Sequence, residues 1–144
     1  MVYVLDTNII IHYLRKEPNV RLNFRGAVTE NHDIIIPQVV DYEMSRGFRI
    51  AEAPRKEASY HILLQDCAIA EMDAKSWNHA ARVYETLYRK SFTVGELDML
   101  IGAFCLVNDY TLVTNNTNDF VNMNGIKLID WTLPQPAVSG GQFS

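Results

Sequence analysis

Short apolar runs alternate with longer amphipathic stretches along most of the chain. The short runs contain β-branched residues and end at a polar residue or a proline, which is typical of buried strands. The stretches between them carry apolar residues at three- and four-residue spacing, which predicts helices. We expect strands at residues 2–5, 33–37, 67–72, 112–114 and 126–129, with helices beginning near residues 7, 18, 39, 54, 74 and 98.

This alternation predicts an α/β fold in three layers, with a central, mainly parallel sheet of about five strands flanked by helices. Sheets of this kind bind ligands outside the carboxyl ends of their strands. Asp6 directly follows the first predicted strand and Thr114 lies at the end of the fourth. The sequence therefore places both residues at the edge of the sheet where a site is expected.

Length and composition favour one domain. The chain has 144 residues, of which 48% are hydrophobic, enough for one substantial core. We assign residues 1–132 to this domain. Residues 133–144 mix proline and glycine with few residues to bury, so we expect a flexible tail. Neither a signal sequence nor an apolar run long enough to span a bilayer is apparent, which predicts a cytoplasmic protein.

The net charge of −4 argues against a protein held to nucleic acid by a broad basic surface. Nearly all basic residues lie in the first 90 positions, and only Lys127 follows them. A polyanionic substrate must therefore be bound locally.

Four acids stand where a strand ends or a helix begins: Asp6, Glu43, Asp98 and Asp119. Acids at helix starts often serve only as caps or favourable charges, and each residue taken alone suits that role. However, Asp6 follows a strand that we expect to be buried, and Asp98 precedes a very apolar helix, where an unpaired carboxylate is costly. Carboxylates that converge without a cation also repel one another, and Mg²⁺ prefers such oxygen ligands.

Four segments, in this order, resemble the signature of PIN domains, and more narrowly that of VapC-type toxins of bacterial toxin-antitoxin pairs. The resemblance runs from Tyr3 to Trp131. It implies a PIN-like fold and a Mg²⁺-dependent endoribonuclease in which Mn²⁺ can substitute and metal-activated water cleaves the RNA. The segments are Val-Leu-Asp6-Thr-Asn8, Glu43-Met-Ser-Arg-Gly47, Asp98-Met-Leu-Ile-Gly-Ala103 and Leu-Val-Thr114-Asn.

The resemblance makes Asp6, Glu43 and Asp98 the catalytic acids that bind the metal. Asn8 and Thr114 become supporting polar residues near them.

The fourth acid departs from the family pattern. Many members carry Thr-x-Asp at the end of the fourth strand, whereas this chain has Asn116 at that position and its next acid at Asp119. Either Asn116 supplies an amide oxygen, or Asp119 reaches the site and helps to position the attacking water.

The sequence Thr114-Asn-Asn-Thr117 is similar to that of VapC toxins that cut initiator tRNA in the anticodon loop, which implies tRNA as the substrate. Arg46 and Arg49, close to Glu43, are the candidate contacts to RNA phosphates. The resemblance further implies a cognate VapB-type antitoxin that blocks the cleft. An aromatic stripe at helical spacing predicts either core or the interface of a homodimer, and consists of Trp77, Tyr84 and Tyr88.

Two other functions stay open at this stage. An aspartate after the first strand also suits a phosphoryl-transfer enzyme or a receiver domain, but the chain lacks the paired acids of those proteins beside Asp6. The second alternative is a catalytically inactive PIN-like module that binds RNA or a protein, against which the retention of three acids argues.

Overall fold

The computed structural model describes residues 1–136, and its centre is a five-stranded sheet with the strand order β3-β2-β1-β4-β5. All four strand pairs are parallel, as the alternation of strands and helices predicts. The strands are β1 (Val2–Leu5), β2 (Asp33–Pro37), β3 (Ala68–Ala70), β4 (Thr111–Val113) and β5 (Lys127–Ile129).

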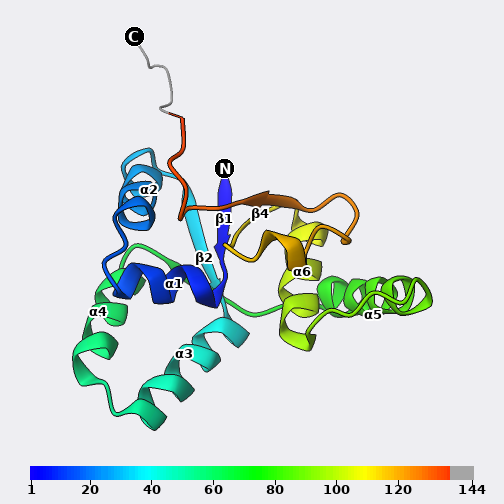
Figure 1. The fold of residues 1–144 in the computed structure, drawn as a ribbon, viewed down its shortest axis with the longest axis horizontal. Helices are drawn as coiled ribbons and strands as arrows, with labels where there is room; N and C mark the ends of the chain where they lie inside the picture. The colour runs from blue at the N-terminus through cyan, green and yellow to red at the C-terminus, as the bar shows by residue number, and fades with distance from the viewer. Residues whose placement is uncertain (137–144) are drawn as a thin grey trace.

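Helices cover both faces of the sheet, so the predicted three-layer α/β fold is confirmed. In Figure 1, α1 to α4 lie to one side of β1 and β2, and α5 and α6 lie to the other. The helices are α1 (Thr7–Leu14), α2 (Pro18–Thr29), α3 (Gln38–Ala51), α4 (Pro54–Leu64), α5 (Ala74–Arg89) and α6 (Glu96–Asn108), and a 3-10 turn, η1, spans Thr117–Asp119.

The register of β1 and β4 brings two of the predicted site residues together. Leu5 pairs with Val113 in the last step of this ladder. The backbone N–H of Asp6 then donates to the carbonyl of Val113 over 3.0 Å, and that of Thr114 donates to the carbonyl of Ile129 over the same distance. Asp6 and Thr114 therefore leave the carboxyl edge of the sheet side by side.

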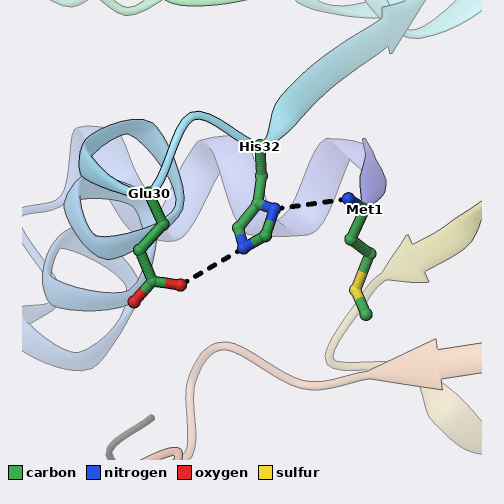
Figure 2. A network of polar contacts seen from close by, with 3 residues as sticks. All are labelled: Met1, Glu30 and His32. Atoms are coloured by element: carbon green, nitrogen blue, oxygen red, sulfur yellow. Dashed lines mark hydrogen bonds and ion pairs between the residues drawn. The ribbon is translucent and has the colours of Figure 1, made fainter. Parts of the chain in front are cut away.

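The opposite end of the sheet is held by a small polar network. Figure 2 shows His32 between the amino group of Met1 and the carboxylate of Glu30. His32 Nδ1 lies 3.3 Å from the Met1 nitrogen, and Nε2 lies 3.2 Å from Glu30 Oε1. The network ties the start of β1 to the turn before β2 and lies at the strand ends remote from Asp6.

A glycine in α6 allows the loop after η1 to pack closely. A Cβ on Gly102 would run into the Sδ and Cε atoms of Met123, which is 2% exposed. We expect Gly102→Val to lower the free energy of unfolding by about 3 kcal/mol, because overpacking forces buried neighbours to move. Urea unfolding measures the change. Gly26→Val is the control, because a Cβ there meets nothing within 4 Å; an equal loss in both variants would contradict the packing argument.

The aromatic stripe of α5 is not part of the core. Trp77 is 51% exposed, Tyr84 49% and Tyr88 72%, whereas α5 buries the small residues Ser76 and Ala80 together with Leu87. The core interpretation of the stripe is therefore wrong, and a subunit interface remains a prediction.

Most of the predicted flexible tail, residues 133–144, lies outside the described residues. In its described part, Gln135 Nε2 donates to the carbonyl of Asp130 over 2.8 Å. None of the helices within residues 1–136 is long and apolar enough to cross a membrane.

Candidate metal and nuclease site

Asp6 is a buried carboxylate held in one orientation. It caps α1, and its Oδ1 accepts the backbone N–H of Thr7 over 2.8 Å. Its Oδ2 accepts the side-chain amide of Asn8 over 3.0 Å and the hydroxyl of Thr114 over 2.9 Å. These contacts place the two predicted supporting residues directly against Asp6.

The surroundings of Asp6 raise its pKa. Burial is the main cause, and the negative charge of Glu43 adds to it, whereas the hydrogen bonds from Thr114, Thr7 and Asn8 lower the pKa. The side chain is only 5% exposed, so little water is available to solvate its charge. A nearby cation would stabilise the ionised form.

Glu43 reaches the site from the second turn of α3. Its Oε1 accepts the hydroxyl of Thr7 over 2.7 Å. Thr7 thus connects Asp6, through its backbone, to Glu43, through its side chain. The sequence prediction did not include this bridge.

Asp98 lies in the first turn of α6. Its pKa is raised to about 6, first by partial burial and then by the charges of Asp6, Asp119 and Glu43. Since these charges act only at short range in the presence of water and salt, the four carboxylates form one electrostatic group. The acids that act on Asp98 come from the N-cap of α1, from α3 and from η1.

Of the two candidates for the fourth position, Asp119 belongs to this electrostatic group. Asp119 lies in η1, is exposed and contributes to the raised pKa of Asp98. Asn116 is also exposed, and its backbone N–H donates to Thr114 Oγ1 over 3.0 Å. The side chain of Asn116 makes no hydrogen bond within residues 1–136.

The donor chemistry suits a hard divalent cation. The group contains carboxylate oxygens without cysteine or histidine, as Mg²⁺ prefers. As they stand, no three His, Cys, Asp or Glu side chains within residues 1–136 form a group that could hold a metal ion. Asp6 is fixed by its hydrogen bonds, so a common ion would require rotation of the more exposed acids toward it.

The two predicted phosphate contacts lie on the surface of α3. Arg46 and Arg49 are both exposed, and the guanidinium of Arg46 lies 5.1 Å from the centre of the Tyr42 ring. Neither arginine pairs with an acid in the part of the chain that the structure describes. Both cations therefore stay available to a ligand.

A groove of about 220 Å³ opens beside Glu43 between α1, α3 and α4. Its apolar lining includes Ile11 and Phe48, and Arg15 and Lys56 add two basic side chains to it. Glu43 belongs to both the groove and the acidic group, and Thr7, which also lines the groove, donates a hydrogen bond to it.

Two polar residues next to the site, His12 and Asn115, were missed in the sequence. Asn115 Nδ2 lies 3.0 Å from His12 Nε2. The available signal was the spacing of Asn8 and His12, which are four positions apart on a predicted helix and so share one face.

Comparison with known proteins points to one family. Among curated relatives, Ribonuclease VapC2 of Rickettsia felis is 28% identical over 91% of this chain and 98% of that protein. The tRNA(fMet)-specific endonuclease VapC of Shigella flexneri is 26% identical over 90% of this chain and 98% of that protein.

Solved structures agree with the sequence relatives. The crystal structure of VapBC2 from Rickettsia felis bound to a promoter DNA fragment aligns with a TM-score of 0.82 and 26% identity, covering 91% of this chain and 99% of that one. DNA-bound VapBC from Salmonella typhimurium aligns with the same TM-score at 25% identity, covering 91% and 98%. The family model "PIN domain" matches residues 3–126. The chain therefore belongs to the PIN-domain family, and its resemblance to VapC-type proteins is confirmed.

Proposed function

We propose that this protein is a Mg²⁺-dependent endoribonuclease that acts as the toxin of a toxin-antitoxin pair, with the activity in residues 1–132. Two observations carry the proposal: Thr7 bridges Asp6 and Glu43 at the carboxyl edge of the sheet, and the charges of nearby acids, together with partial burial, raise the pKa of Asp98 to about 6. Relatives named as ribonucleases over almost the whole chain support it.

Asp6, Glu43 and Asp98 are the residues that would hold Mg²⁺, with Mn²⁺ as a substitute. When bound, the cation would activate water and stabilise the charge that builds on the scissile phosphate. Asp6 is fixed by Asn8 and Thr114, and Thr7 orients Glu43. Asp119, the most exposed of these acids, orients the attacking water.

The proposed substrate is tRNA, with the anticodon loop of initiator tRNA as the first candidate. A relative of similar length is named for its specificity toward tRNA(fMet), which supports this choice. Arg46 and Arg49 would contact phosphates, since a chain with a net charge of −4 must bind RNA locally. Loop RNA offers unstacked bases and an accessible backbone to such a site.

A VapB-type antitoxin is the proposed protein partner, because the aligned structures are VapBC complexes. The groove between α1, α3 and α4 suits an apolar side chain of the antitoxin, and the acidic group beside it suits a basic one. We also propose a homodimer that covers the exposed stripe of Trp77, Tyr84 and Tyr88.

Incubation of a total tRNA pool with the purified, antitoxin-free protein tests the function. We expect discrete fragments with Mg²⁺ or Mn²⁺, none with chelator, and none with Asp6→Asn. If neither cation supports cleavage, the nuclease proposal is wrong and a non-catalytic PIN-like binding module becomes the better account.

A pair of variants separates the two candidates for the fourth position. We expect Asp119→Ala to lower the cleavage rate between about tenfold and a hundredfold, as loss of a residue that orients an active group does. Asn116→Ala, its matched control in the same loop, should retain the rate within about threefold. Single-turnover cleavage of one tRNA measures both. The opposite ranking would assign the position to Asn116.

A further inference from the structure

The side chains of His12 and Asn115 form a layer of polar contacts behind Asn8. His12 lies on α1 one turn after Asn8, and Asn115 follows β4. Asn115 Nδ2 lies 3.0 Å from His12 Nε2, and the backbone N–H of Asn115 donates to Asn8 Oδ1 over 3.1 Å. An amide NH₂ can only donate, so Nε2 of His12 accepts. The segment after β4 is thus held to α1 at two points.

The orientation of the Asn8 amide decides which atom faces Asp6. Asn8 Nδ2 donates to Asp6 Oδ2 over 3.0 Å. Half a turn of the amide would place its oxygen against that carboxylate oxygen, and two acceptors repel. The N–H of Asn115 opposes this rotation, because it binds the oxygen of the amide on the other side.

One side-chain atom of Asn115 is poorly satisfied. Its Oδ1 is buried and lacks a hydrogen-bond partner among the described residues. Such an atom costs stability, and an apolar side chain would avoid that cost. An apolar side chain could not make the contact with His12. This contact holds the Asn115 backbone, whose N–H orients Asn8.

We propose that His12 and Asn115 are positioning residues that lock the Asn8 amide and thereby preset the Asp6 carboxylate for a divalent cation. The inference rests on the function proposed above. Neither side chain hydrogen-bonds to a carboxylate within residues 1–136, so both act through Asn8.

The test is the affinity of the full chain for Mn²⁺ without RNA, measured from the electron paramagnetic resonance signal of free Mn²⁺. We expect His12→Leu, which keeps the side-chain volume but removes the acceptor, to weaken Mn²⁺ binding about tenfold. Loss of a residue that helps to orient a metal ligand has an effect of this size. His12→Gln should restore it, because the Gln oxygen can accept from Asn115. His61→Leu is the matched control, since His61 is exposed on α4.

Asn115→Ala should weaken Mn²⁺ binding as His12→Leu does, and the double variant should lose nothing more, because both residues act through one contact. Equal Mn²⁺ affinity in wild type and either variant, or additive losses, would overturn the proposal. Thermal melting checks that each variant is folded. If His12→Leu does not fold, the Mn²⁺ affinity of Asn115→Ala is compared with that of the wild type instead. A protein that shows this binding pattern but cuts no RNA would refute the ribonuclease and leave the positioning role standing.

Discussion

Replacement of Asp6 by asparagine is expected to lower the rate of tRNA cleavage by about 10³-fold or more, because a lost ligand removes several kcal/mol of transition-state stabilisation. Both Asp6 oxygens accept hydrogen bonds, Oδ1 from Thr7 and Oδ2 from Asn8 and Thr114. An asparagine must turn its NH₂ toward one of these donors. The variant therefore loses both the charge and the fixed geometry.

Single-turnover cleavage across a range of Mg²⁺ concentrations measures this loss. Asp33→Asn is the matched control, because Asp33 is an exposed aspartate at the start of β2, away from the carboxyl edge of the sheet. It should cleave within about twofold of wild type. Cleavage by folded Asp6→Asn at more than a tenth of the wild-type rate would remove Asp6 from the proposed mechanism.

The sheet could be predicted because each strand is a short run of β-branched or apolar residues bounded by polar residues or proline. Once strands and helices alternate, a parallel sheet follows, and with it the common edge at which Asp6 and Thr114 leave β1 and β4. The alternation of strands and helices did not predict where Glu43 and Asp98 lie, because both residues are in helices. Their assignment depended on the family resemblance. In the structure, the hydrogen bond from Thr7 holds Glu43 near Asp6, and the charges of both acids contribute to the raised pKa of Asp98.

Side-chain contacts between distant segments could not be predicted in the same way. The hydrogen bond from Thr7 to Glu43 spans 36 positions, and that between Asn115 and His12 spans 103. No local pattern specifies such pairs. The prediction that the aromatic stripe on α5 belongs to the core was wrong for a related reason. Periodicity identifies an apolar face of a helix but not what covers that face. Ala80 and Leu87 meet the core, and Tyr84 and Tyr88 stack on each other at the surface.

Asp98→Asn is expected to lower the rate of tRNA cleavage about as much as Asp6→Asn does. It is nevertheless expected to stabilise the protein when divalent cations are absent. The pKa of Asp98 is raised to about 6 in the fold, whereas an unfolded aspartate titrates near about 4. Between these values the folded state holds a proton that the unfolded state has released. The free energy of unfolding therefore falls as pH rises from about 4 to about 6, and the full penalty is present above that window.

Urea unfolding at pH 8 with chelator should give Asp98→Asn a gain of about 1 kcal/mol, since partial exposure screens much of the repulsion. Across pH 4–6 the variant should lack the fall in stability that Asp98 causes. With Mg²⁺ the wild type should have the higher free energy of unfolding, because Mg²⁺ binding stabilises the wild type and not a variant that has lost a ligand. Asp66→Asn, an exposed aspartate outside the group, should change neither result. An unchanged order in Mg²⁺ would mean that Asp98 faces the acids without sharing a cation with them.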